Sequence, residues 1–419
     1  FVDNTARPTL SDRGVLITSA ADWRKITEGI ESIRDFPKRP LVDEPGWLGG
    51  YFADASGKVY TPEGSPKGTA LFQPNRQSGG TKGSLKAWQQ QVASPLTGQN
   101  LLMIAVFIAF AAPLLRLTGE THNPGFEFSG PPETGKTTTL RLMASIAGPP
   151  HAIPNFNSTI AGLESMFPEH RDLPFPVDEA NLADRKRLLI DFAFRMANGT
   201  AKVTAYQEDR AQVRFIFATT ANRPFFEALK AIDTDTANAA LQRLMPLRIA
   251  DGAFGVFDFV PDGFTTSGEF AAYLEETINR QYGTPMRSFL RELVNAHAQD
   301  PKGFQAKLRK LIGRFAKKVG VAATSRGKTR ATTTFGLLYA AGVLAKRWDI
   351  LPKKWQCMSA CVAGYRNYQA QLPAQTPLLT RLATIAARSQ TMDLREGDRP
   401  SLTDEQIEEA GAFLITGVG

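Results

Sequence analysis

The segment Gly130-Pro131-Pro132-Glu133-Thr134-Gly135-Lys136-Thr137 constrains this chain more than any other feature. It matches the pattern G-x-x-x-x-G-K-[ST] at every fixed position, which average residue usage would produce by accident in about one chain of this length in a hundred. Phe126-Glu127-Phe128 predicts a buried strand before the segment, and residues 138–146 predict a helix after it. In this order, backbone N–H groups and the positive end of the helix surround a phosphate. The sequence therefore predicts a nucleotide-binding loop, with a chance glycine turn as the alternative.

The polar residues of this loop have distinct expected roles. Lys136 brings positive charge to the phosphates, and Thr137 offers its hydroxyl to Mg²⁺. We therefore expect ATP and Mg²⁺ as ligands. Contacts with the nucleotide are expected from Gly130, Pro131, Pro132, Glu133, Thr134, Gly135, Lys136, Thr137 and Thr138.

The length and apolar content of the chain predict more than one core. Its 419 residues are 42% apolar, which is enough for two or three domains. The longest apolar run, residues 101–115, is shorter than a bilayer requires and contains Pro113, so it predicts a core helix and not a membrane span. We expect a cytoplasmic protein with no membrane partner. Because the first residue is Phe1 and not Met, we expect a piece of a longer product.

Cysteine and charge content narrow the classes of partner. Cys357 and Cys361, the only cysteines, are four residues apart on one predicted helix with no histidine nearby, so they predict core residues and not a zinc site. The net charge of +8 and the pI near 9.4 favour an anionic partner, and the nucleotide accounts for part of this charge.

Changes of pattern along the chain predict four regions. Residues 1–35 predict a helical element, in which a short strand at 15–17 precedes a helix. Residues 36–83 predict a small β-rich unit that ends in a glycine-rich linker at 78–83. Residues 84–250 alternate helical and apolar β-type runs, which predicts an α/β core around a mostly parallel sheet. Residues 251–419 predict an α-helical domain, with helices over 270–281, 286–298, 304–319, 334–347, 353–371 and 378–388.

Two adjacent carboxylates follow the phosphate loop. The apolar run 173–177 ends in Asp178 and Glu179, and a buried strand would bring both to its carboxyl end. Asp178 is expected to hold Mg²⁺ through its water shell, and Glu179 to orient or deprotonate the attacking water. An acid that activates water favours hydrolysis over transfer to a second substrate. The alternative is an Asp-Glu pair that caps the next helix.

Two further polar residues follow along the chain, Asn222 and Arg243. Asn222 ends the apolar run 213–220 and, after the loop and the acidic pair, resembles the first sensor of the AAA+ ATPases, which would contact the γ-phosphate. The alternative for Asn222 is a turn former before Arg223-Pro224. Residues 241–246 resemble the arginine-finger segment, which implies that Arg243 reaches the γ-phosphate bound by a neighbouring subunit. The alternative for Arg243 is a surface position on a helix.

Successive landmarks carry a closer resemblance over roughly residues 15–370. They are Gly46-Trp47, the run 101–117, Gly135-Lys136-Thr137-Thr138, residues 158–164, Asp178-Glu179 and residues 197–202. In this order they resemble the helicase-like AAA+ ATPases found beside or fused to primases in phages, plasmids and staphylococcal cassette elements. Most members of this group are classed as a bacterial domain of unknown function. The chain departs from many of them at Pro131-Pro132, where they have small hydroxyl residues.

The resemblance also implies where DNA binds. Residues 198–210 precede the Asn222 strand and predict a hairpin or loop. In ring helicases the insertion at this place points into the central pore and carries a basic residue that follows the DNA backbone. Lys202 is the first candidate and Arg210 the second, with a plain surface hairpin as the alternative.

A basic segment lies in the helical region. Residues 302–330 contain ten Lys or Arg and no Asp or Glu, and their apolar residues predict one helical face beside a basic stripe. The stripe is compatible with a nucleic-acid surface, with a surface that faces a neighbouring subunit or the nucleotide, or with a solvated face. A second sensor would be Arg314, Arg326 or Arg330, which the sequence does not rank.

These observations lead to two functional hypotheses. The first is a ring-forming, hexameric DNA helicase or translocase that hydrolyses ATP at its subunit interfaces, with single-stranded DNA and a primase as partners. The second is an AAA+ ATPase that remodels or switches a protein complex without unwinding DNA. Both use the same catalytic residues, so only the 198–210 insertion and the basic segment separate them.

Overall fold

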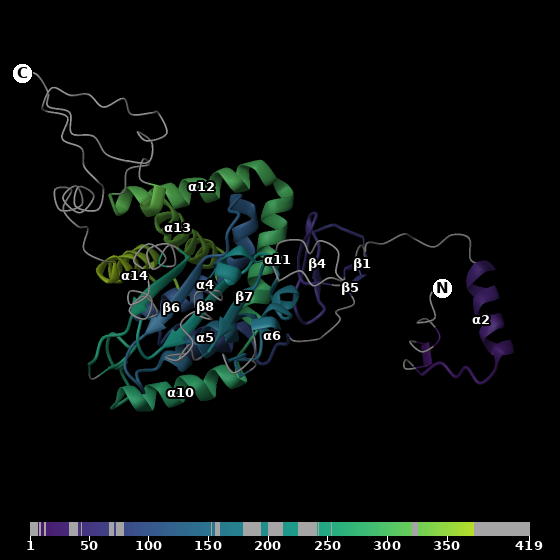
Figure 1. Cartoon of the computed structure of the whole chain (residues 1–419), viewed down its shortest axis with the longest axis horizontal. Helices are drawn as coiled ribbons and strands as arrows, with labels where there is room; N and C mark the ends of the chain where they lie inside the picture. Colours follow the sequence, from purple (N-terminus) through teal and green to yellow (C-terminus); the bar gives the residue numbers. More distant parts are fainter. Residues whose placement is uncertain are drawn as a thin grey trace, which may run out of the picture. The chain divides into compact units, whose positions relative to one another are not determined.

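The structure is a computed structural model that describes residues 7, 10–11, 14–32, 41–42, 44–66, 71–72, 79–151, 153–155, 160–178, 194–199, 213–224, 241, 243–252, 254–320 and 326–372. Its contacts divide the chain into two compact units, Phe1–Tyr368 and Gln369–Gly419. The helices and strands of the first unit are labelled in Figure 1.

A parallel sheet forms the centre of this unit. Its strands are β6 (Gly125–Ser129), β7 (Pro174–Val177), β8 (Ile216–Ala221) and β9 (Leu244–Arg248), in the order β7-β8-β6-β9. Every pairing is parallel, with Ser129 opposite Ala221 and Arg248. Nearly every strand residue is buried, as expected for a sheet covered on both faces by helices. The predicted mixed α/β fold with a parallel sheet is therefore confirmed.

The prolines of the sheet lie on its edge strands. Pro174 and Pro176 belong to β7, and Pro246 belongs to β9. Proline has no backbone N–H to donate to a second neighbour, so a strand that contains it is restricted to an edge. The local pattern of the sequence does not predict β9, because Pro246 interrupts its short apolar run.

One apolar helix is almost entirely buried beside the sheet. Of the helices that the structure describes, α4 (Asn100–Thr118) is long and apolar enough to cross a membrane, and 78% of its most apolar window is buried. It packs against α5 (Lys136–Ala147) and α13 (Arg326–Arg347). This burial is that of a core helix, as predicted.

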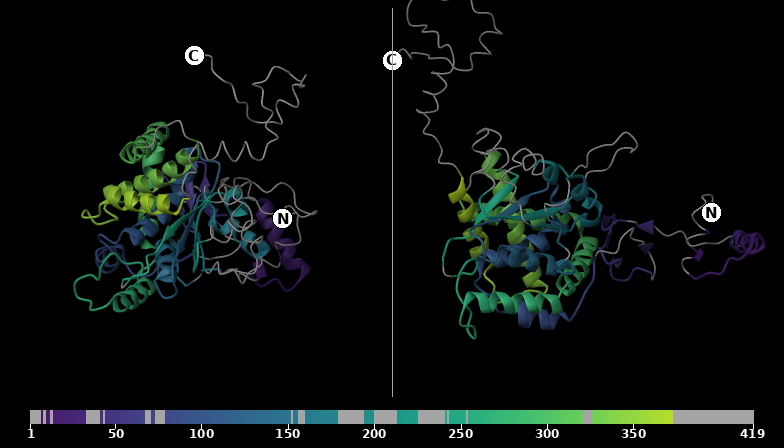
Figure 2. Two further views of the ribbon diagram at one scale, coloured as in Figure 1. Left: turned by 60° about the vertical axis from the view of Figure 1, so that its left-hand side comes forward. Right: turned by 60° about the horizontal axis from the view of Figure 1, so that its bottom comes forward.

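Further helices surround the sheet. In Figure 1, α5 and α10 (Ser267–Arg280) lie below the sheet, while α12 (Pro301–Lys318), α13 and α14 (Cys357–Gln371) lie together above it. Figure 2 shows these elements from two other sides. The ring of Phe335 on α13 meets that of Phe126 on β6 edge to face, with centroids 5.6 Å apart. Five shorter or flanking helices also belong to the unit: α3 (Leu85–Trp88), η1 (Gln89–Ala93), α6 (Ile160–Glu164), η2 (Phe167–His170) and α11 (Thr284–Gln299).

Five of the six predicted helices of the C-terminal region are present as α10 to α14. The predicted helix at 378–388 lies outside the described residues. Helix α13 begins at Arg326, eight residues before the predicted start at Thr334. The prediction missed this first part because its residues are polar and show no apolar period.

Cys357 and Cys361 are buried and free, and burial raises the pKa of the Cys357 thiol to about 11. Their prediction as core residues is confirmed.

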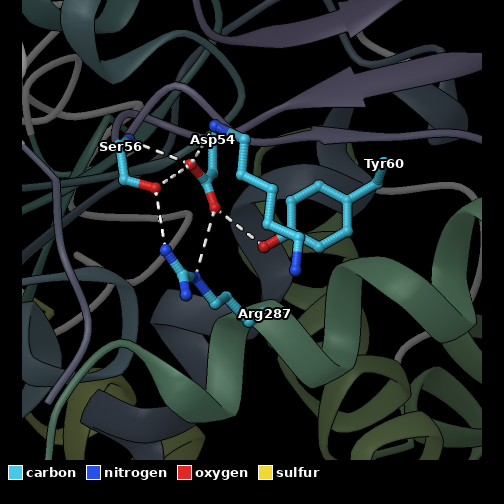
Figure 3. A network of polar contacts seen from close by, with 5 residues as sticks. Asp54, Ser56, Tyr60 and Arg287 are labelled. Atoms are coloured by element: carbon cyan, nitrogen blue, oxygen red, sulfur yellow. Dashed lines mark hydrogen bonds and ion pairs between the residues drawn. The ribbon is translucent and has the colours of Figure 1, made fainter. Parts of the chain in front are cut away.

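A small antiparallel sheet precedes the main sheet, as predicted. It consists of β2 (Gly46–Leu48), β3 (Tyr51–Ala53) and β4 (Val59–Tyr60), while β1 (Leu41–Val42) pairs with β5 (Leu71–Phe72). Buried Asp54 accepts hydrogen bonds from the Tyr60 hydroxyl (2.7 Å) and the Ser56 hydroxyl (2.5 Å). Arg287 of α11 donates to Ser56 Oγ (3.1 Å), and its Nε lies 3.8 Å from Asp54 Oδ2, so this network joins the small sheet to α11 (Figure 3).

Two details of the N-terminal region differ from the predictions. Residues 15–17 form no strand, and Leu16 is 85% exposed, because an isolated apolar triplet has no partner strand in the described residues. Helix α2 (Ala20–Ser32) follows as predicted. The predicted glycine-rich linker at 78–83 is tied to the core in its described part, residues 79–83. There, Lys82 and Tyr282 exchange two backbone hydrogen bonds of 3.0 Å.

Candidate functional site: a phosphate loop and an arginine pocket

The predicted phosphate loop connects the end of β6 to the start of α5, as the sequence analysis expects. The Gly130 N–H donates to Ala221 O at the end of β8 (3.1 Å), which fixes the beginning of the loop. Within the loop, Glu133 and Gly135 have positive φ angles of 61° and 86°. Left-handed residues that alternate with right-handed ones build concave backbone nests, which bind anions.

The back of the loop is closed by residues that the sequence analysis did not identify. The Val256 N–H donates to Thr134 O (2.8 Å), and a Cβ at position 135 would lie 2.7 Å from Val256 Cγ1. Gly135 is therefore required both for its positive φ and for this close approach. No local pattern around Val256 indicates this role, because it depends on a contact across more than a hundred residues.

The Lys136 ammonium lies over the loop. Its Nζ donates to the carbonyl oxygen of Gly130 (2.9 Å) and also to that of Pro131. Burial lowers the pKa of Lys136, and the charge of Asp178 opposes that shift. A positive group is thus placed beside the first peptides of α5, where the helix end also favours an anion.

Thr137 and Asp178 converge from different elements. Asp178 directly follows β7, and its Oδ1 lies 3.5 Å from Thr137 Oγ1 on α5. The same oxygen accepts a hydrogen bond of 2.5 Å from Thr220 Oγ1 on β8. The Asp178 N–H donates to Pro154 O (2.8 Å), so its backbone is fixed as well. The structure therefore brings together the hydroxyl and the carboxylate that the sequence analysis assigned to the metal.

Asn222 also lies at the carboxyl ends of the strands. It follows β8 directly and is exposed, one residue beyond the Ala221 that pairs with Ser129. Its position is compatible with a contact to a phosphate held by the loop. Glu179, Lys202 and Arg210 lie outside the described residues.

Thr138 faces away from the loop. Its hydroxyl donates to Glu275 Oε1 on α10 (2.7 Å), and the other oxygen of Glu275 pairs with Arg141 (2.9 Å). A contact between Thr138 and a nucleotide would therefore come from its backbone. Pro132 and Glu133 are exposed at the rim of the loop.

Arg243 lies at the other end of the parallel strands, where the strands begin. It precedes β9, and its carbonyl oxygen accepts from the Gly125 N–H at the start of β6 (2.8 Å). The five residues of β6 rise ~3.3 Å each, so Arg243 is about 15 Å from the loop of its own chain. It lies in a turn and not on a helix.

A pocket at this amino edge holds a second arginine. Arg330 of α13 lines the pocket together with Arg243, beside Glu120 and His122. The Arg243 guanidinium carbon lies 4.5 Å from the centre of the Phe194 ring. Burial, and then the charge of Arg330, lower the pKa of Arg243. Of the three second-sensor candidates, Arg330 is thus beside Arg243, Arg314 is exposed on α12, and the side chain of Arg326 lies outside the described residues.

Comparison with solved structures finds the same fold in a structure titled as SCCmec type IV Cch, an active helicase. The TM-score is 0.67 at 16% identity, and the match covers 88% of this chain and 67% of that chain. An inhibitor-bound JCV helicase (14% identity, 57% of this chain, 65% of that chain) has a TM-score of 0.25. A structure of the NrS-1 C-terminal region has a TM-score of 0.24 at 13% identity, and the match covers 78% of this chain and 82% of that chain. Scores this low support no comparison of the folds.

Comparison by sequence shows the family. A search of curated proteins gives no match. The model of the family described as Domain of unknown function (DUF927) matches residues 2–214, which is half of the chain. The chain therefore belongs to the DUF927 family.

Proposed function

We propose that this chain is an ATP-hydrolysing AAA+ motor, a ring-forming DNA helicase or translocase of a phage or mobile element. The observation that carries the proposal is the convergence of the phosphate loop and Asp178, with Thr137 Oγ1 and Asp178 Oδ1 3.5 Å apart. In the proposed division of the chain, residues 84–250 are the ATPase core, 251–419 the helical domain, and 1–35 and 36–83 the N-terminal elements.

The sheet topology supports a ligand at this place. The chain leaves β6 for β7 and β8 on one side and later returns to β9 on the other side. In open parallel sheets, ligands bind beyond the carboxyl ends of the strands where the strand order reverses its direction. The loop at 130–135 follows the carboxyl end of β6, which is that point.

The side chains at the loop fit ATP with Mg²⁺. Thr137 and Asp178 offer oxygen ligands, which Mg²⁺ prefers, and they would hold the ion beside the phosphates. The ion would neutralise charge on the β- and γ-phosphates. Lys136 would exchange the carbonyl oxygens of Gly130 and Pro131 for phosphate oxygens. Glu179 is proposed to activate water and Asn222 to contact the γ-phosphate.

The position of Arg243 supports catalysis between subunits. It is about 15 Å from its own phosphate loop, at the other end of β6. A second copy of the chain could present this edge to the loop of the first, as a closed ring of identical subunits requires. Arg243 would then act on the γ-phosphate of the neighbour, and a hexamer is the proposed assembly.

DNA is the proposed substrate for two reasons. The chain shares its fold with a structure whose title calls it an active helicase, and its net charge is +8. Lys202, with Arg210 second, is proposed to follow the backbone of single-stranded DNA in the pore. A primase is the proposed further partner, since the resembled ATPases occur beside or fused to primases.

Strand displacement on a forked DNA tests the proposed function. The unmodified chain should separate the strands only with ATP and Mg²⁺, and Lys136→Ala should abolish the separation. Lys202→Ala should keep ATP hydrolysis but lose both its stimulation by DNA and strand separation. If DNA changes neither the ATPase rate nor the assembly state of the unmodified chain, the motor is wrong, and an ATPase that remodels a protein complex becomes the better account.

A further inference from the structure

The positive charge of the chain is concentrated in one helical region. Residues 301–372 contain 15 Lys or Arg and one acid, Asp349, whereas the rest of the chain contains 34 Lys or Arg and 40 Asp or Glu. The excess charge of the protein therefore belongs to α12, α13, α14 and the segments between them.

Part of this charge surrounds an open hollow at the end of α13. Residues 346–347 and 353–354 contribute four cations, and Arg347, Lys353 and Lys354 are exposed. Half-buried Tyr339, Val343 and Met358 supply apolar surface between them. We call this site the basic hollow; its lining residues are Tyr339, Val343, Lys346, Arg347, Lys353, Lys354, Trp355, Gln356, Cys357 and Met358.

Helix α12 extends the positive surface. Burial lowers the pKa of Lys307 on α12, and the charge of Arg347 lowers it further. The charge of Arg314 likewise acts on the pKa of Tyr339, which burial raises. Residues 301–347 contain no acid, so α12 and α13 present only positive groups here. Like charges held together favour an anion that contacts several of them.

Three hydrogen bonds hold part of the wall of the hollow. Lys346 Nζ donates to Trp355 O (2.7 Å), and the Trp355 indole N–H donates to Ala93 O (3.0 Å). Gln89 donates to the backbone oxygen of Asp349 (2.5 Å). The Asp349 carboxylate pairs with Lys353, so the single acid of this region offsets one cation only. The part of the wall held in this way loses little conformational entropy when a ligand binds.

We infer that the basic hollow binds the phosphodiester backbone of single-stranded nucleic acid. Several neighbouring cations can follow a phosphodiester backbone, and the apolar surface of Tyr339, Val343 and Met358 would accommodate bases. The inference rests on the proposed function for its choice of partner. The hollow is distinct from the arginine pocket, because 17 residues of α13 separate Arg330 from Arg347, about 25 Å along the helix. It is also separate in sequence from the proposed pore residues, Lys202 and Arg210.

A charge-removal variant of the full chain tests the hollow. Arg347→Ala/Lys353→Ala/Lys354→Ala removes three exposed cations, and Lys82→Ala/Lys86→Ala/Arg280→Ala removes three exposed cations elsewhere as the matched control. The probe is a fluorescent 30-nucleotide oligothymidylate without ATP, titrated by anisotropy at several salt concentrations. For single strands, each lost phosphate contact reduces the slope of log K against log salt concentration by ~0.7. The hollow variant lacks three cations, so its slope should be smaller by about 2, and it should bind at least about tenfold more weakly.

The possible outcomes separate this inference from the proposed function. The control variant should bind within about twofold of the unmodified chain, and Arg347→Lys/Lys353→Arg/Lys354→Arg, which keeps the charge, should restore the affinity and the slope. Equal binding by the hollow variant and the unmodified chain would overturn the inference and leave an acidic protein surface as the partner. Because binding is measured without ATP, a chain that binds DNA through the hollow but hydrolyses no ATP would refute only the proposed function.

Discussion

Asp178 Oδ1 lies 3.5 Å from Thr137 Oγ1 and accepts a hydrogen bond from the Thr220 hydroxyl. One carboxylate oxygen therefore links the end of β7 to β8 and to the first turn of α5. The residues of this pair are 41 positions apart in the chain. Their proximity places a carboxylate oxygen beside the predicted phosphate loop, and the proposed chemistry depends on it.

Replacing Asp178 by Asn should therefore separate fold from chemistry. Asn keeps the size of the side chain and can still accept from Thr220, but it removes the negative charge next to Thr137. ATP hydrolysis should fall by about 10²–10³-fold, the scale typical of one lost electrostatic contact in an active site. The measurement is steady-state phosphate release, with Asp262→Asn at an exposed position as the matched control. Equal rates for the two variants would remove Asp178 from the site.

Arg243 should act on the neighbouring subunit. Arg243→Ala and Glu179→Gln should each hydrolyse almost no ATP. In a random equal mixture, about a quarter of the interfaces of a cyclic ring combine an intact Glu179 with an intact Arg243, and activity should return in proportion. The measurement is ATPase rate against mixing ratio. Arg243→Lys controls for loss of the contact with Phe194. A mixture as inactive as its components would contradict a site completed by the partner.

His170 should make stability fall as pH falls. Burial lowers its pKa to about 4, while its Nδ1–H donates to Pro174 O (2.8 Å) and its ring stacks on Phe175. An unfolded histidine titrates near 6.5, so between about pH 6.5 and pH 4 the unfolded state binds more protons, and folding stability decreases as pH decreases. The residue keeps some exposure, so the loss should be about 1–3 kcal/mol.

The check for His170 is urea denaturation at pH 7.5 and pH 4.5. His170→Gln keeps a side-chain N–H donor but does not titrate, so its loss of stability over this range should be smaller than that of the unmodified chain by the same amount. The same pH dependence in both proteins would show that His170 is not responsible.

The small N-terminal sheet should depend on Arg287. Removing this side chain leaves Asp54, whose side chain is only 10% exposed, without its cation and Ser56 Oγ without a donor. Leaving buried polar groups without their partner costs ~1–3 kcal/mol, which corresponds to roughly 5- to 150-fold more frequent local opening. Hydrogen exchange of the β3 and β4 amides measures this. Arg291→Ala, one turn further along α11 and exposed, is the control. Unchanged exchange in Arg287→Ala would show that the network does not hold the sheet.

Local patterns account for the features that the sequence predicted correctly. The loop at 130–137, the strand before it and α5 follow from glycine, lysine and apolar residues within one short segment. Asp178 was placed at a strand end because the run before it is apolar. The helices α10 to α12 follow from apolar residues at helical spacing, which depends on neighbours three and four positions away.

Contacts between distant segments account for what could not be predicted. Arg330 joins Arg243 only because α13 packs beside the amino edge of the sheet, and no spacing in the sequence encodes that approach. Strand β9 is recognisable only from its pairing with β6, since Pro246 weakens its pattern. Thr138 was expected at the nucleotide, but Glu275 of α10 accepts its hydroxyl. The basic hollow likewise depends on α12 packing beside α13.

The proposed motor is tested most simply by the ATPase rate of the unmodified chain with Mg²⁺, measured with and without single-stranded DNA at saturating ATP. Hydrolysis should require Lys136, increase with DNA and rise more steeply than linearly with protein concentration as the interfaces form. A folded protein that hydrolyses no ATP in the presence or absence of DNA, or one whose Lys136→Ala variant hydrolyses ATP equally fast, would contradict it.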